Sequence, residues 1–385
     1  MIKMSAKHNS YIMCSNKITA SELREILLMQ VNGIINDVER AKKLPPILIS
    51  GAPGIGKSTI VKSVADELGI GFIDVRLAQM DAVDIRGLPS IDANNNSMVW
   101  NPPSFWPRDN NSRGILFLDE LTAAPKDIQV ASYQLILDRC IGDSYKVPDG
   151  WYICAAGNRV EDRAVAMTMS SALANRFMHV ELTEDAEEWA TWATQNNINP
   201  SVIGFIRYRP EMLFHTEGEN LERGWPSPRS WEKVSHMIDI MEQTNAKKNI
   251  VKKIVFGLVG DGAGAEFMEF YKNRSIYENI LEMMLDETKE IIIPEKADQQ
   301  YAFEASIIYH LWRGKDEVDE RNRLNGFFRI IKKLPSNFST MAMIDAMSFD
   351  SSHKKINKDY TSILFSHPSY KDWAKIHGKS MRKHI

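Results

Sequence analysis

The sequence has little cysteine and no clustered metal ligands. Its 385 residues include three cysteines, Cys14, Cys140 and Cys154, which lie far apart and form no C-x-x-C motif. We therefore expect neither a disulfide framework nor a structural zinc site, and a reducing compartment is favoured. The nine histidines show no H-x-x-x-H or H-E-x-x-H spacing, so the common zinc-hydrolase motifs are excluded.

Long apolar runs and a large net charge are also missing. Nowhere do about 18 apolar residues follow one another, and the N-terminal residues lack the apolar core of a signal peptide. We expect no membrane span, no secretion signal and a cytoplasmic location. The net charge of −3 is small, so nucleic acid is not favoured as a partner of the whole chain.

What the sequence does contain is a complete phosphate-binding loop. Residues 51–58 read Gly-Ala-Pro-Gly-Ile-Gly-Lys-Ser, which matches G-x-x-x-x-G-K-[ST]. In this motif the glycines let the backbone approach a polyphosphate, the lysine reaches the β- and γ-phosphates, and the serine hydroxyl can ligate Mg²⁺. An apolar run at 46–50 predicts a strand before the loop, and helical periodicity over 58–68 predicts a helix after it. The predicted ATP-binding residues are Gly51, Ala52, Pro53, Gly54, Ile55, Gly56, Lys57, Ser58 and Thr59, with Ser58 also a ligand of Mg²⁺.

Strands and helices alternate through the first half of the chain, and helices alone follow. Buried strands are predicted at 71–76, 114–118, 151–156 and 178–182, hairpins at 88–101 and 140–147, and helices at 19–32 and 128–139. This alternation predicts an α/β fold with a parallel sheet covered by helices on both faces. After Thr183 the periodicity is helical, with almost no strand signal. The predicted organisation is an N-terminal tail (1–18), an α/β nucleotide-binding domain (19–182), a helical lid domain (183–290) and a C-terminal helical extension (291–385).

Polar side chains follow two of these strands at their carboxyl ends, where ligands of parallel sheets bind. Asp119 and Glu120 end the strand at 114–118, and Asn158 follows the strand at 151–156. Asp119 can hold Mg²⁺, Glu120 can polarise the water that attacks the γ-phosphate, and Asn158 can hydrogen-bond that water or the γ-phosphate. An isolated Asp-Glu pair or Gly-Asn pair would be a surface turn, but the upstream phosphate loop favours the catalytic interpretation.

Two arginines complete the set of candidates. Arg176 lies in Ser171-Ala-Leu-Ala-Asn-Arg-Phe177, and Arg229 in Trp225-Pro-Ser-Pro-Arg-Ser-Trp231. A guanidinium can neutralise charge on a transferring phosphoryl group. Most arginines are solvated surface residues, so this interpretation depends on the neighbouring motifs.

Taken in order, these motifs resemble an AAA+ ATPase. The segment 76–81, the segment 84–87 and the two hairpins are more similar to the MoxR-like branch, and the resemblance covers residues 19–290. It implies a P-loop NTPase core with an all-α lid, Asn158 as sensor 1, Arg176 as an arginine finger contributed to a neighbour's site, and Arg229 as sensor 2 in cis or in trans. MoxR-like proteins often have asparagine after the acidic pair, whereas this chain has Leu121-Thr122.

The resemblance also implies a function. It implies a homo-oligomeric, hexameric ring that hydrolyses ATP with Mg²⁺ and remodels or matures a protein client, with a von Willebrand A domain protein as partner. Two alternatives stay open. A nucleic-acid-linked or defence-system motor would share the ATP chemistry and bind DNA or RNA in a salt-sensitive way. A nucleotide-dependent scaffold would hydrolyse ATP poorly, and the intact Glu120 argues against it.

Overall fold

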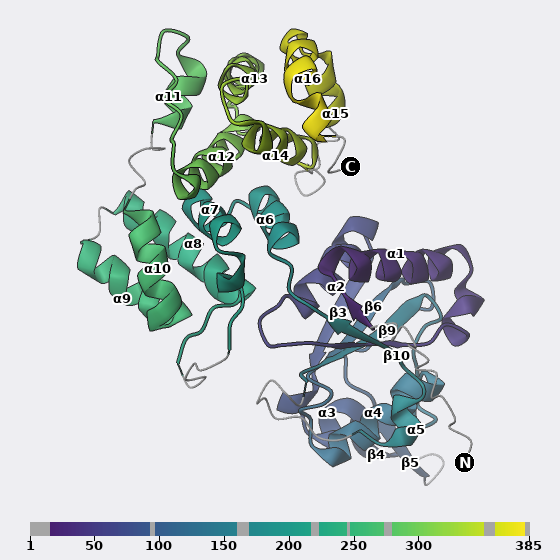
Figure 1. The fold of residues 1–385 in the computed structure, drawn as a ribbon. Coiled ribbons are helices and arrows are strands. Elements are labelled where there is room, and N and C mark those ends of the chain that lie inside the picture. The colour runs from purple at the N-terminus through teal and green to yellow at the C-terminus, as the bar shows by residue number, and fades with distance from the viewer. Residues whose placement is uncertain are drawn as a thin grey trace, which may run out of the picture. The chain divides into compact units, whose positions relative to one another are not determined.

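The computed structural model describes residues 16–92, 97–159, 169–216, 223–244, 247–272, 279–349 and 359–381. The chain divides into two compact units, which Figure 1 shows as ribbons. The first consists of Met1–Pro53 and Lys57–Thr183, and the second of Gly54–Gly56 and Glu184–Ile385. No described helix has both the length and the apolar character that crossing a membrane requires. Residues 1–15 of the predicted tail lie outside the described residues.

A parallel sheet forms the centre of the first unit. Across the sheet its strands are β1 (Lys17–Ile18), β10 (Met178–Leu182), β2 (Ile47–Ser50), β9 (Trp151–Gly157), β6 (Gly114–Asp119) and β3 (Gly71–Arg76). Every neighbouring pair is parallel. The predicted parallel α/β sheet is therefore confirmed, while the two-residue strand β1 was not predicted.

Both faces of the sheet are buried, because successive side chains of a strand point to opposite faces. On β6, Ile115 and Phe117 alternate with Leu116 and Leu118, and all four are fully buried. Helices α1 (Ala20–Asn36) and α2 (Lys57–Leu68) cover one face, and α3 (Ala82–Arg86) and α4 (Lys126–Asp138) cover the other (Figure 1). Because both faces are buried, the sequence of β6 is a continuous apolar run up to Leu118 and does not alternate between apolar and polar residues.

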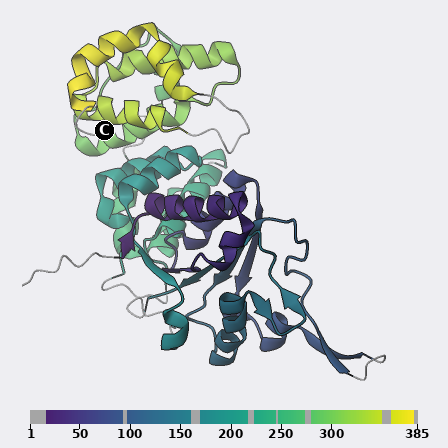
Figure 2. The same cartoon turned by 90° about the vertical axis from the view of Figure 1, so that its right-hand side faces the viewer.

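Two small hairpins and one short helix complete the first unit. The hairpins are β4 (Leu88–Asp92) with β5 (Ser97–Asn101), and β7 (Cys140–Ile141) with β8 (Tyr145–Lys146); the helix α5 (Ser171–Ala174) precedes β10. Both predicted hairpins are confirmed. Figure 2 shows the β4–β5 hairpin, in blue, projecting away from the sheet. Short 3-10 helices are η1 (Val38–Lys42), η2 (Leu77–Gln79) and, in the second unit, η4 (Pro210–Met212).

The regular elements described in the second unit are all helices. Its helices are α6 (Ala186–Gln195), α7 (Pro200–Tyr208), α8 (Pro228–Gln243), α9 (Lys248–Val259), α10 (Asp261–Tyr271), α11 (Ile280–Leu285), α12 (Ala297–Leu311), α13 (Glu317–Ile331), α14 (Ser336–Met347), α15 (Tyr360–Ser366) and α16 (Pro368–Met381). One continuous hydrophobic core joins them. Helix α7 packs on α12 so closely that a Cβ added at Gly204 would lie 2.7 Å from the Ala302 Cα. Residues of the predicted lid and of the predicted extension share this core, and their separation into two domains stays a prediction.

Candidate nucleotide site

The phosphate-binding loop connects the end of β2 to the start of α2. Strand β2 ends at Ser50 and helix α2 begins at Lys57. Between them Gly54 and Gly56 have φ angles of 85° and 99°, a backbone conformation that side chains with a Cβ rarely adopt. A Cβ at Gly56 would meet no atom within 4 Å. The loop therefore has an open side at the N-terminus of a helix, where backbone N–H groups and the helix dipole attract anions.

Lys57 connects this loop to Asn158, which follows strand β9. Its Nζ donates to the carbonyl oxygens of Gly51 at 2.7 Å and Ala52 at 3.0 Å, and to Asn158 Oδ1 at 3.2 Å. The sheet explains the contact, because β2 and β9 are neighbours and Ser50 pairs with Gly157. The structure thus brings together two predicted site residues that are separated by 101 positions in the sequence.

The acidic pair lies at the same edge of the sheet. Asp119 is the last residue of β6, and its Oδ1 accepts the Glu120 N–H at 2.8 Å. Glu120 has a φ of 58°, which is uncommon for a residue other than glycine and often marks a functional turn. Its carbonyl oxygen accepts the N–H groups of Ala123 and Ala124 at 3.0 and 3.1 Å. The backbone therefore leaves the strand direction at Glu120, in a tight hydrogen-bonded turn.

A third carboxylate contributes to the charge at this edge, and the sequence analysis did not single it out. Asp74 lies on β3, next to β6 in the sheet. Burial raises the pKa of Asp74, and the charges of Asp119 and Glu120 raise it further while Arg76 opposes them. The end of β6 is thus a region of concentrated negative charge, which a cation would stabilise. Asp74 lies within a strand and belongs to no motif, so its contribution to the charge could not be predicted from the sequence.

The oxygen donors at this edge fit a magnesium-nucleotide complex. Ser58 lies in the first turn of α2 and Asp119 at the end of β6; hydroxyl and carboxylate oxygens are ligands that Mg²⁺ prefers. Among the residues that the structure describes, no group of three His, Cys, Asp or Glu side chains is placed to hold a metal. Mg²⁺ in phosphate sites uses one or two carboxylates together with phosphate oxygens, so these residues would hold it only together with a nucleotide.

Arg176 lies at the amino ends of the strands, whereas the phosphate loop of the same chain lies at their carboxyl ends. It follows α5 and precedes β10, where the Met178 N–H donates to the Pro46 carbonyl oxygen at 2.9 Å. Met178 pairs with Ile47, the first residue of β2, whereas the loop follows Ser50, the last. At about 3.3 Å per residue, the amino end and the carboxyl end of β2 are roughly 10 Å apart. Arg176 is therefore not placed to reach a nucleotide in its own loop.

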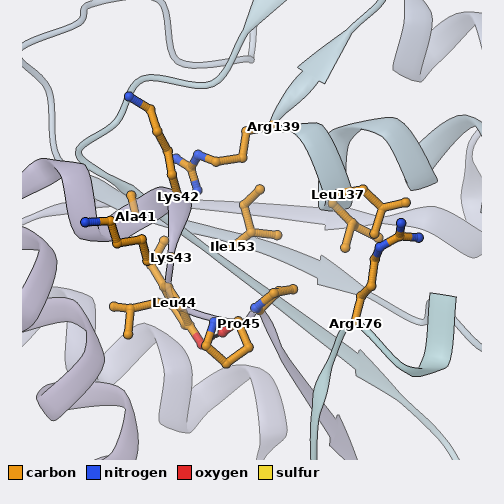
Figure 3. Close-up of a pocket in the computed structure, with 12 residues that line it drawn as sticks. Ala41, Lys42, Lys43, Leu44, Pro45, Leu137, Arg139, Ile153 and Arg176 are labelled. Atoms are coloured by element: carbon orange, nitrogen blue, oxygen red, sulfur yellow. Dashed lines mark hydrogen bonds between the residues drawn. The ribbon is translucent and has the colours of Figure 1, made fainter. Parts of the chain in front are cut away.

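A pocket opens beside Arg176. Figure 3 shows Arg176 and Arg139 on opposite sides of it, with Ile153 and Leu137 between them. The Arg139 Nη2 donates to the carbonyl oxygens of Pro148 and Trp151 at 3.0 and 2.7 Å. Because this guanidinium is engaged by the backbone, Arg139 has a structural role. Arg176 has an exposed side chain and is the residue of this pocket that the sequence analysis predicted to contact a ligand.

Arg229 lies in the helical unit, on the first turn of α8. Ser227 caps this helix, since its Oγ accepts the Ser230 N–H at 3.2 Å, and Pro228 is the first helical residue. The Ser-Pro-Arg-Ser segment is thus a helix start that presents an exposed arginine. Its assignment as sensor 2 stays a prediction.

Part of the first unit is similar to a known protein family. Residues 47–179 match the family described as "ATPase family associated with various cellular activities (AAA)". The match covers about a third of the chain, and the first unit, which contains the matched residues, is called the AAA domain below. The match runs from the start of β2 into β10, so it contains the loop, the acidic pair, Asn158 and Arg176. Proteins with AAA domains bind nucleotides at the phosphate loop, and the parallel sheet of this chain has the AAA+ P-loop NTPase fold.

Individual relatives are more distant. One curated relative is the Holliday junction branch migration complex subunit RuvB of Acholeplasma laidlawii, 26% identical over 121 residues; the match covers 31% of this chain and 30% of the relative. A solved RuvB mutant of Thermotoga maritima is 16% identical, with a TM-score of 0.38 over 80% of this chain and 89% of the other. NtrX of Brucella abortus in complex with ADP is 14% identical, with a TM-score of 0.36 over 81% and 68%. At these TM-scores neither structural likeness bears on function.

Proposed function

We propose that the AAA domain binds and hydrolyses ATP with Mg²⁺ at the sheet edge that carries the phosphate loop. The observation that carries the proposal is the contact between the Lys57 ammonium and the Asn158 amide, at the same edge as Asp119 and Glu120. Lys57 and the loop N–H groups would bind the phosphates, and Ser58 and Asp119 would hold Mg²⁺, which when bound neutralises phosphate charge. Glu120 would orient and polarise the attacking water, and Asn158 would hold that water or the γ-phosphate.

The position of Arg176 supports assembly into a ring. Arg176 lies at the sheet edge opposite its own loop, so its proposed role as an arginine finger requires the site of a second copy. A head-to-tail interface of this kind repeats around a closed ring. We propose a hexamer on the basis of the MoxR-like resemblance, in which the helical unit acts as a lid and Arg229 acts as sensor 2.

The β4–β5 hairpin supports a protein client. Pro89 pairs with Trp100 and Ile91 with Met98, so all four side chains share one face of the hairpin. Ile91 is 80% exposed and Met98 67%, and residues 88–101 contain no lysine or arginine. An exposed apolar face without positive charge suits contact with a protein more than with a phosphate backbone. A von Willebrand A domain partner and a cytoplasmic location belong to the same proposal.

The alternative is a nucleic-acid motor. The curated RuvB relative, named as part of a branch migration complex, favours it. A duplex or single strand that stimulates ATP turnover, with an effect that falls steeply between low and physiological salt, would support this alternative. Stimulation by unfolded or von Willebrand A domain proteins, with none by DNA or RNA, would support the protein-directed function.

Two variants and a control test the proposed chemistry. Glu120→Gln should reduce ATP turnover at least about 100-fold and retain nucleotide binding, because it removes a group that acts on the water. Lys57→Ala should lose nucleotide binding itself. Lys62→Ala, an exposed position on the same helix, should change neither. Full turnover in Glu120→Gln, or unchanged nucleotide affinity in Lys57→Ala, would rule the assignment out.

A further inference from the structure

We infer that Thr122 is a positioning residue that holds the backbone of Asn158 against the Glu120 turn. This inference rests on the proposed ATP hydrolysis and adds a residue to it. Thr122 touches no reacting atom in the proposed scheme, so its effect would pass through Asn158. Neither its sequence position, two residues after Glu120, nor any motif predicted the role.

The Thr122 hydroxyl makes two hydrogen bonds to one residue. Its Oγ1 accepts the backbone N–H of Asn158 at 3.1 Å and donates to the backbone carbonyl oxygen of Asn158 at 3.3 Å. A hydroxyl has one donor and two acceptor sites, so both bonds can form at once. Together they fix the peptide groups on both sides of the Asn158 Cα, immediately past the end of β9.

The absence of a side chain at Gly157 leaves space for the Thr122 side chain. A Cβ added at Gly157 would lie 2.5 Å from Thr122 Oγ1 and 2.6 Å from its Cγ2, closer than any real Cβ contact. Gly157 therefore leaves the room that Thr122 occupies. One residue before Thr122, the Leu121 N–H donates to the Ala156 carbonyl oxygen at 2.9 Å. The turn that begins at Glu120 is thus bonded to the end of β9 on both sides of Gly157.

These hydrogen bonds connect the candidate catalytic groups in one network. Thr122 holds the Asn158 backbone, and the Asn158 side chain accepts from the Lys57 ammonium. Glu120 begins the turn that carries Thr122. Loss of the hydroxyl would leave the Asn158 N–H and carbonyl without this partner and let the amide shift relative to Glu120. Small displacements of positioned groups reduce turnover strongly, whereas they change ground-state binding less.

Isosteric substitution separates the hydroxyl from the packing. Thr122→Val keeps the shape and removes the hydroxyl; we expect ATP turnover to fall about tenfold to 100-fold, with nucleotide affinity changed less than about threefold. Thr122→Ser restores the hydroxyl and should recover turnover to within about threefold of the wild type. Thr191→Val is the matched control. Its hydroxyl donates to the Glu187 carbonyl oxygen at 3.0 Å within helix α6 of the helical unit, so its turnover should be unchanged.

A double-mutant cycle distinguishes positioning from general destabilisation. If Thr122 acts through Asn158, Thr122→Val in an Asn158→Ala background should lower turnover less than about twofold further, because coupled residues are not additive. Additive losses, or equal losses in Thr122→Val and Thr122→Ser, would overturn the inference. If Thr122→Val fails to fold, Thr122→Ala takes its place with the same expectations.

Glu120→Gln, measured alongside, separates the two levels of the proposal. If Glu120→Gln loses turnover and Thr122→Val keeps it, the positioning role of Thr122 is wrong and the ATPase site stands. If Glu120→Gln keeps turnover, the proposed site itself is wrong.

Discussion

The two units of the chain place their polar and charged residues in opposite ways. In the AAA domain, Lys57, Asp119, Glu120 and Asn158 gather at the ends of strands, where a ligand can reach them. In the helical unit, Arg207 of α7 lies 2.8 Å from Glu304 of α12 and 2.6 Å from Asp345 of α14, and the three side chains are 1%, 0% and 5% exposed. The polar groups at the strand ends are the ones proposed to act on ATP, while the buried cluster connects three helices of one core.

This difference predicts how the units respond to substitution. Replacing a polar residue of the AAA site should remove activity and leave the fold intact. Replacing a member of the buried cluster should lower the stability of the helical unit, because breaking one partner of a buried ion pair leaves the others uncompensated. The experiments below test this contrast, from the largest expected effect to the smallest.

Arg176→Ala should have the largest effect. Removal of an arginine finger lowers turnover by about 10³-fold or more, and we expect nucleotide affinity and the unfolding temperature to stay close to those of the wild type. ATP turnover and nucleotide titration on the same preparation check this. Arg113→Ala is the control, an exposed arginine that immediately precedes β6 and should retain full turnover. Loss of nucleotide binding in step with turnover would contradict a finger role.

Arg207→Met should destabilise the helical unit by about 3–5 kcal/mol, since Glu304 and Asp345 would lose their buried cation. Denaturant unfolding of the full chain measures this loss. Arg209→Met is the matched control on the same stretch of chain: its ion pairs with Glu211 and Glu266 are at 2.6 and 2.9 Å, but its side chain is 37% exposed. Surface pairs contribute about 0–1 kcal/mol. Equal losses of unfolding free energy in the two variants would contradict the claim that the buried ion pairs stabilise the unit more than the exposed ones.

Acidification should weaken the helical unit through His310 on α12. Burial, with help from the charges of Arg323 and Arg313, lowers the pKa of His310 from 6.5 to about 4. The unfolded chain therefore binds the proton first as the pH falls, so stability that is complete above about pH 6.5 is lost progressively toward pH 4. We expect a loss of about 1–2 kcal/mol between pH 7 and pH 5. Calorimetry at the two pH values should show a smaller loss in His310→Gln, and no such difference for the exposed His236→Gln.

Helix caps should show the smallest effect, and the same one in both units. Thr19 caps α1 of the AAA domain in a capping box with Glu22, and Asp185 caps α6 of the helical unit by accepting the Glu188 N–H at 2.8 Å. Because capping is local, Thr19→Ala and Asp185→Ala should each cost about 1 kcal/mol. Thermal unfolding measures both. A cost several-fold larger in one unit would mean that its cap has a role beyond the helix end.

The sequence predicted those features that depend on local patterns. The loop at 51–58, the strand ends at Asp119 and Asn158 and the two hairpins all follow from short motifs or apolar runs, and the structure has each strand or hairpin where it was expected. Strand β1 and the short helices α3 and α5 were missed, since two to five residues are too few to show a period. Neither Thr122 nor the Arg207 cluster was predicted. Their partners lie 36 and 97 residues away, and only the fold brings them together.

Complementation between two inactive variants tests the central claim most directly. Arg176→Ala and Glu120→Gln would each be assayed alone, then mixed in equal amounts at low concentration and concentrated together. In a mixed ring, a subunit that retains Glu120 can receive Arg176 from a neighbour that lacks Glu120. The account predicts that the mixture regains turnover, up to about a quarter of the wild-type rate for random assembly into head-to-tail rings. A mixture as inactive as its components, or an Arg176→Ala variant that is active alone, would contradict a site completed in trans.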